Sequence, residues 1–254
     1  MLVLLPPSEG KTAPSRGKSL ALDSLASPEL SATRHTILEA LVALCAGDPE
    51  AAAVTLGLGP TQADAVTRNT TLRGEPTARA DKIYTGALYS SLDLKSLDAV
   101  ARRRATASIA IASGLFGLIR PGDRIPAYRL SGDVSLPGVG PVASAWRGPL
   151  ATVVPGLVGS GLLVDLRSQM YLNLYKPDAA LAKRTATMRV LHESGGARKV
   201  VSHFNKATKG RIVRAMLTEG VGPRTIDGLA EALRDLGWTV ERDRNRLDIV
   251  VREV

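Results

Sequence analysis

The amino-acid sequence predicts one α+β unit, a mixed α/β arrangement of residues 1–254 around a central sheet. Three short apolar runs have the length and composition of buried strands: 1–5, 105–113 and 162–166. By contrast, residues 31–46 and 226–236 repeat apolar side chains at helical spacing. Strands and helices mix without a regular βαβ period, and no linker or internal repeat divides the chain. We therefore expect a single domain.

Further elements follow from local composition. Asp48-Pro49 predicts a turn after the first helix, and 94–104 predicts a helix that ends in three arginines. Pro137-Gly138 favours a ribbon that pairs 134–136 with 142–146. Four more expected elements are a weak helix over 148–158, a strand over 199–204, a basic helix over 206–218 and a terminal hairpin that pairs 238–240 with 247–251.

The charge balance favours an anionic partner. Of 254 residues, 33 are Lys or Arg and 24 are Asp or Glu, which gives a formal net charge of +9 at pH 7. The 44 % of hydrophobic residues excludes a wholly disordered chain. Nucleic acid or phosphate would suit the excess of positive charge, although basic residues also serve solubility alone. Aromatic residues make up 4 %, too few for a surface that stacks many unpaired bases.

Cysteine usage and hydropathy indicate the compartment. Cys45, the single cysteine, excludes an internal disulfide, and its apolar helical setting does not favour a reactive thiolate. The longest apolar candidate, 105–119, is shorter than the ~20 residues that a membrane-spanning helix needs. We expect no signal peptide, no membrane contact and a cytoplasmic location. His35, His192 and His203 lack metal-ligand spacing, so we expect no metal and no cofactor.

The sharpest local pattern is Gly220-Val221-Gly222-Pro223-Arg224 between two predicted helices. The two glycines permit a tight hairpin with positive φ, and the proline suits the first turn of a helix. The pattern resembles a helix-hairpin-helix element, in which backbone amides and a helix N-terminus hold a DNA phosphate. The alternative is an ordinary helix–turn–helix corner, in which the turn only allows the two helices to pack against each other. The expected DNA-binding residues are Lys206, Lys209, Arg211, Arg214, Gly220, Gly222 and Arg224.

Polar side chains also follow several predicted strands, where open α/β sheets place ligand sites. Ser8, Glu9 and Lys11 lie on the loop after the first strand, which is not a P-loop because its glycine spacing is wrong. Tyr128 and Arg129 follow a proline-rich turn. Each group has a structural alternative, such as a surface ion pair or a packing device. The candidate catalytic residues are Ser8, Glu9, Lys11, Tyr84, Ser113, Tyr128, Arg129, Asp165 and Lys206.

These motifs together resemble the YaaA family of bacterial peroxide stress proteins. The strongest correspondence is the family pattern Ser-Gly-Leu-Tyr-Gly-x-Leu-Arg-Pro-x-Asp followed by Pro-Tyr-Arg-Leu. It stands here as residues 113–123, with Phe116 in place of Tyr, and as 127–130. Other matching segments are 7–12 for the loop after the first strand, 83–86 for Val-Tyr-Thr-Gly, Trp146, 163–168 and 206–211. The match runs nearly from end to end, but Glu9-Gly10 departs from the family's first loop.

The resemblance implies a cytosolic DNA-binding protein with an unusual α+β fold, a basic cleft and a helix-hairpin-helix. It also implies a role in limiting oxidative DNA damage and free iron under hydrogen peroxide. Two hypotheses remain open at this point. One is a module that binds duplex DNA with low sequence specificity. The other is an enzyme that acts on a nucleotide or nucleobase, or binds another phosphate ligand, in a pocket of strand-end residues. Whether the protein is an enzyme, and its oligomeric state, stay open.

Overall fold

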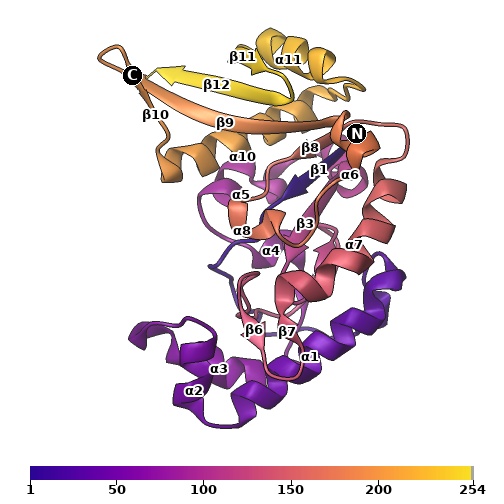
Figure 1. Cartoon of the computed structure of the whole chain (residues 1–254), viewed down its shortest axis with the longest axis vertical. Coiled ribbons are helices and arrows are strands. Elements are labelled where there is room, and N and C mark those ends of the chain that lie inside the picture. Colours follow the sequence, from indigo (N-terminus) through magenta and orange to yellow (C-terminus); the bar gives the residue numbers. More distant parts are fainter. Residues whose placement is uncertain (253–254) are drawn as a thin grey trace.

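The computed structural model describes residues 1–252, and the side chains of all of these except residues 202 and 203, so the expectation for His203 lies outside the described residues. It is a mixed α/β fold with an eight-stranded central sheet (Figure 1). The strands are β1 (Leu2–Leu5), β2 (Ala78–Arg79), β3 (Ile109–Ser113), β4 (Gly117–Ile119), β5 (Arg124–Ile125), β6 (Ser135–Leu136), β7 (Gly140–Pro141), β8 (Leu163–Asp165), β9 (Thr185–Ser194), β10 (Ala197–Lys199), β11 (Thr239–Asp243) and β12 (Arg246–Arg252).

The centre of the sheet is parallel. Its order is β11-β12-β9-β8-β1-β3-β4, and β12, β9, β8, β1 and β3 all run in the same direction. The outer strands β4 and β11 pair antiparallel, as does β10 against β9. Every residue of β1 and β3 is buried, as expected for parallel strands that are covered on both faces. The carboxyl ends of β8, β1 and β3 therefore lie side by side at one edge.

Helices cover the sheet and extend the molecule beyond it at one end. Helix α10 (Ser202–Glu219) packs against α5 (Ala87–Leu92), α6 (Ala99–Ser108) and β9, and α11 (Ile226–Asp235) packs on β11. In Figure 1, α11 lies at the top of the long axis and α1 to α3 lie at the bottom. The helices are α1 (Ser31–Ala46), α2 (Pro49–Thr55), α3 (Ala63–Thr70), α4 (Ala80–Ile83), α5 (Ala87–Leu92), α6 (Ala99–Ser108), α7 (Val142–Val158), α8 (Gln169–Leu172), α9 (Ala179–Ala182), α10 (Ser202–Glu219) and α11 (Ile226–Asp235). Within the described residues, none of them is both long and apolar enough to cross a bilayer.

Several predicted elements are wrong, and the reasons are local. Asp48 does not open a turn: its carboxylate accepts from the Glu50 amide and caps α2. The ribbon around Pro137-Gly138 is present, but it pairs β6 with β7. Residues 142–146 are instead the start of α7, whose buried Trp146, Leu150 and Val154 repeat every four residues. The strand predicted over 199–204 is wrong, because β10 ends at Lys199 and α10 begins at Ser202. Helix α6 also runs past its predicted end to Ser108, which shortens β3.

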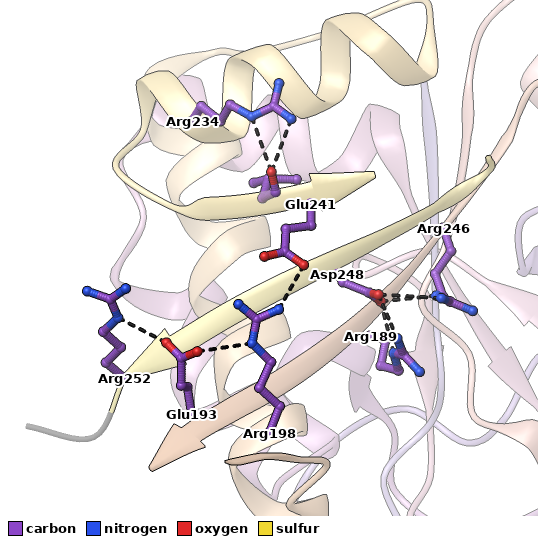
Figure 2. A network of polar contacts seen from close by, with 9 residues as sticks. Arg189, Glu193, Arg198, Arg234, Glu241, Arg246, Asp248 and Arg252 are labelled. Carbon is purple, nitrogen blue, oxygen red and sulfur yellow. Dashed lines mark hydrogen bonds and ion pairs between the residues drawn. The ribbon is translucent and has the colours of Figure 1, made fainter. Parts of the chain in front are cut away.

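Part of the basic excess is neutralised within the C-terminal hairpin and β9 (Figure 2). Arg189 and Arg246 both donate to the carboxylate of Asp248, at 2.6–3.4 Å. Burial raises the pKa of Asp248, but the hydrogen bonds from these two arginines outweigh it and hold that pKa below its usual value. A second group, on these strands and β10, joins Glu193 to Arg198 and Arg252, and Arg198 to Glu241. The net charge of +9 is thus not spread evenly over the fold.

Candidate functional site

The predicted strand-end residues gather at the carboxyl edge of the parallel sheet. The loop 6–12 follows β1, Ser113 ends β3, and Asp165 ends the neighbouring β8. A cavity of about 290 Å³ opens at this edge. It is lined by residues of the loop, of α5, of α8 and of α10, among them Ser8, Glu9, Thr85, Tyr89, Met170, Tyr171 and Lys206.

The loop after β1 is fastened to the segment 83–86. The Tyr89 hydroxyl donates to the Pro6 carbonyl at 2.6 Å, and the Thr12 amide donates to the Ile83 carbonyl at 2.8 Å. A Cβ on Gly10 would lie 2.7 Å from the Thr85 hydroxyl oxygen, so a larger residue there would require the Thr85 side chain to shift. These contacts fix the backbone that carries Ser8, Glu9 and Lys11.

Lys11 points its ammonium group between two phenol rings. Its Nζ donates to the Ser8 carbonyl at 2.8 Å and lies 4.4 Å from the ring centre of Tyr128 and 5.5 Å from that of Tyr84. Burial lowers the pKa of Lys11 to about 7. A substantial fraction of this amine is therefore neutral near physiological pH, which suits it to acid/base or nucleophilic chemistry.

The hydroxyl groups beside Lys11 form a buried chain. The Tyr84 and Tyr128 hydroxyls lie 2.9 Å apart, and the Tyr128 hydroxyl lies 2.6 Å from the Ser113 hydroxyl. The Phe116 amide donates to Ser113 Oγ at 3.0 Å and anchors the chain to the backbone. Burial raises the pKa of both tyrosines well above 10, so the phenols stay protonated and serve as neutral hydrogen-bonding groups.

Arg129 brings a second cation to the edge. Its guanidinium forms an ion pair with Glu9, whose side chain is 51 % exposed, whereas that of Arg129 is 16 % exposed. The fully buried Asn69 of α3 clamps the backbone of Arg129: it accepts from the Arg129 amide at 3.0 Å and donates to the Arg129 carbonyl at 2.8 Å. Glu9 and Met170 line both the first cavity and a second cavity of about 400 Å³ that includes Arg129, so the two cavities adjoin.

Asp165 is at the same edge but is already paired. Its carboxylate receives two hydrogen bonds from the Arg167 guanidinium, at 2.9 and 2.7 Å, and one from the Arg167 backbone amide, at 3.2 Å. Both side chains are almost completely buried. Arg167 also donates to the carbonyls of Tyr171 and Tyr175, at 3.0 and 2.9 Å. The pair therefore ties the end of β8 to the wall of the cavity. Lys209 approaches Asp165 from α10, and burial lowers the pKa of Lys209.

The predicted DNA-binding residues are spread along α10 and the segment 220–225 and do not share one face. Gly220 has φ +72° and ends α10, but Gly222 is outside the positive-φ region. Arg214 donates to the Leu92 and Asp93 carbonyls at 3.1 and 2.8 Å, and Arg211 is exposed. Arg224 lines a hollow of about 250 Å³ at the start of α11, the basic hollow, with Lys183, Arg184 and Arg242.

Sequence reasoning missed the residues that hold the site from a distance. Asn69 and Tyr89 reach it from α3 and α5, and no short motif marks them. Thr85 lies in the matching segment 83–86, but it was not named as a site residue. Burial raises the pKa of Cys45, against a reactive thiolate there. Among the described residues, no group of three or more His, Cys, Asp or Glu side chains is placed to hold a metal.

Comparison with known proteins gives a family for this arrangement. The family model described as peroxide stress protein YaaA matches residues 1–244. A UPF0246 protein of Streptomyces coelicolor is 51 % identical, over 100 % of both chains. A UPF0246 protein of Corynebacterium efficiens is 40 % identical over 97 % of both chains, and one of Corynebacterium glutamicum is 36 % identical over 96 % of both. The chain belongs to the YaaA family of peroxide stress proteins.

Proposed function

We propose that the sheet edge is the active site of an enzyme that acts on a nucleotide, and that the protein serves in the cytoplasmic response to peroxide. The site, called here the strand-edge site, consists of Ser8, Glu9, Lys11, Tyr84, Ser113, Tyr128, Arg129 and Lys206. One observation carries the proposal: Lys11, an amine with a pKa of about 7, lies over the ring of Tyr128, the residue before Arg129.

The two cations suit different parts of a nucleotide. The planar guanidinium of Arg129 matches phosphate geometry, and its present partner Glu9 is half-exposed and free to turn toward water. Lys11 is enclosed by rings and hydroxyls, a setting suited to the sugar or base, where acid/base work needs a group with a pKa near 7. The cavity of about 290 Å³ is at the lower end of the size of small-molecule sites.

Calorimetric titration with AMP and adenosine tests this proposal. We expect AMP to bind more tightly than adenosine, and Arg129→Gln to weaken AMP binding by about tenfold or more, because a hydrogen bond to a charged group contributes roughly 1.5–3 kcal/mol. The matched control is Arg147→Gln, which removes an exposed arginine from α7. Equal affinity for AMP and adenosine, or unchanged AMP binding by Arg129→Gln, would contradict the proposal.

A second proposed function is binding of duplex DNA through phosphates at the segment 220–225. It is favoured by the basic hollow, which four cationic side chains line at the start of α11. One of them, Arg224, is two residues from Gly222 in the sequence. Asp227, which pairs with Arg242 there, offsets part of this charge. Backbone amides at a helix start and nearby arginines are a phosphate-binding combination that reads no base sequence. The family resemblance implies the same contact.

Fluorescence anisotropy with a labelled duplex tests the DNA contact. We expect affinity to fall with salt by a log–log slope of about −0.9 per phosphate contact, and to be unchanged when the DNA sequence is shuffled. Gly222→Val should weaken binding several-fold. No atom lies within 4 Å of a Cβ at Gly222, so this side chain leaves the fold intact and obstructs an approaching phosphate.

Gly59→Val is the control for that substitution, because Gly59 is also exposed and has open space around its Cβ position. Arg224→Gln should reduce the salt slope by about one. If Gly222→Val is folded and binds DNA as the wild type does, the segment 220–225 is not the contact.

A further inference from the structure

We infer that Lys11 is the nucleophile of the strand-edge site and that it bonds through an imine to the C1′ carbon of a phosphorylated ribose. The inference deepens the proposed nucleotide function and rests on it.

The surroundings of Lys11 favour an uncharged amine with a free lone pair. The Nζ donates one hydrogen to the Ser8 carbonyl at 2.8 Å, and the rings of Tyr84 and Tyr128 shield it on other sides. A neutral amine that donates one hydrogen keeps its lone pair for attack on carbon. Since burial lowers the pKa of Lys11 to about 7, this neutral form is well populated near pH 7.

The position of the amine is fixed before a ligand arrives. Ser8 stands on the loop that the Tyr89 hydroxyl holds through the Pro6 carbonyl at 2.6 Å. Lys11 itself pairs with Tyr84 as an isolated β-bridge. A nucleophile held by its own backbone and by one hydrogen bond loses little conformational entropy when it reacts. Its attack on a bound ligand is therefore favoured.

Arg129 selects a sugar that carries phosphate. Two contacts place Arg129 near Lys11. The Lys11 amine lies over the ring of Tyr128, the residue before Arg129. The Arg129 guanidinium also pairs with Glu9, which is two residues before Lys11. A phosphate that displaces the half-exposed Glu9 carboxylate would place the sugar of the same molecule beside Lys11. The neutral phenols nearby supply hydrogen bonds to sugar oxygens without adding charge.

The step balances without another reactant. With free ribose 5-phosphate, the amine attacks the aldehyde carbon, the carbonyl electron pair moves to oxygen, and that oxygen leaves as water with both amine hydrogens. A C=N bond remains. With a nucleotide, the amine attacks C1′ and the bond from C1′ to the base breaks. The base leaves with that electron pair and accepts the proton that the lysine nitrogen loses, which gives a glycosylamine with a closed sugar ring. The nitrogen lone pair then forms the C=N bond as the bond from C1′ to the ring oxygen breaks, and the ring oxygen takes up the remaining amine proton as a hydroxyl group.

Reductive trapping with sodium cyanoborohydride tests the inference. Full-length protein is incubated with ribose 5-phosphate and, separately, with AMP, and then analysed by intact mass and peptide mapping. We expect one adduct on Lys11, with the mass of ribose 5-phosphate less one oxygen, and a yield that rises with pH through about 7 as the amine loses its proton. The same adduct from AMP, with release of adenine, identifies the nucleotide as the source. An adduct from ribose 5-phosphate alone identifies the free sugar phosphate.

Three controls make the outcome decisive. Lys11→Arg should abolish the adduct, Lys199→Arg on the exposed strand β10 should not change it, and ribose without phosphate should give at least tenfold less. Should Lys11→Arg misfold, peptide mapping of the wild type still shows which lysine is modified. No adduct, or an adduct spread equally over surface lysines, overturns the inference. If AMP still binds in the calorimetric titration, the proposed nucleotide site survives that result; if AMP does not bind, both fail.

Discussion

Replacing Arg167 with methionine is expected to lower the free energy of unfolding by about 3–5 kcal/mol, because it leaves the Asp165 carboxylate buried and unpaired. The substitution also removes the hydrogen bonds to the Tyr171 and Tyr175 carbonyls. Urea denaturation followed by circular dichroism measures the effect. Since Tyr171 lines the strand-edge cavity, the same variant should bind AMP less tightly while it remains folded.

Two further variants isolate the cause of that loss. Arg252→Met breaks an ion pair whose arginine is 84 % exposed, and pairs of that kind contribute little to stability because water and salt screen them. The double variant Asp165→Leu with Arg167→Met removes both charges and should be more stable than Arg167→Met alone. If Arg167→Met costs no more than Arg252→Met, the buried pair is not what holds the end of β8.

The chemistry of the sheet edge could be predicted because it depends on local order along the chain. Ser8, Lys11 and Ser113 each follow or end a strand that is recognisable by its apolar composition. The structure shows that these strands are parallel neighbours, which confirms that their carboxyl ends meet. Strand order cannot be read directly from a sequence. Asp165 could therefore be assigned to the edge of the sheet, but its ion pair with Arg167 could not be predicted.

The rest depends on contacts between distant residues. Asn69 holds the backbone of Arg129, 60 positions along the chain, and nothing in its own neighbourhood marks it. Arg34 is fully buried and donates to the Phe116 and Leu118 carbonyls, although its helix reads as an ordinary amphipathic one. Strand β9 was missed because its sequence includes the polar residues Arg189 and His192. Arg189 pairs with Asp248 of the neighbouring β12, and the His192 ring packs against Phe204 of α10. Tertiary packing overrides local preference at each of these positions.

Gly210 of α10 is where such packing should have its clearest effect on this fold. A Cβ there would collide with the Leu88 carbonyl oxygen and lie 3.0 Å from the Leu92 amide nitrogen, both of them backbone atoms of α5. Backbone atoms cannot avoid the contact by a change of rotamer, as a flexible side chain can. The two helices would therefore have to separate. Gly210 also belongs to the segment 206–211 that carries the family resemblance, and close helix contact accounts for the glycine there.

We expect Gly210→Ala to destabilise the protein although helix propensity favours alanine. The gain in propensity is about 1 kcal/mol, whereas overpacking costs typically 1–3 kcal/mol and more where backbone must move. A net loss of about 1–2 kcal/mol in urea denaturation is the expected result. Gly222→Ala is the matched control, because its Cβ would meet nothing within 4 Å.

The same substitution tests whether α10 positions the functional site. Lys206, one turn before Gly210, lines the strand-edge cavity, so a displaced α10 should weaken AMP binding in the folded variant. The basic hollow is at the start of α11, which packs on β11 rather than on α5, so DNA affinity should change less. A stabilised Gly210→Ala variant would mean that α5 and α10 approach less closely than described. An unchanged AMP affinity in a destabilised variant would separate the helix contact from the site.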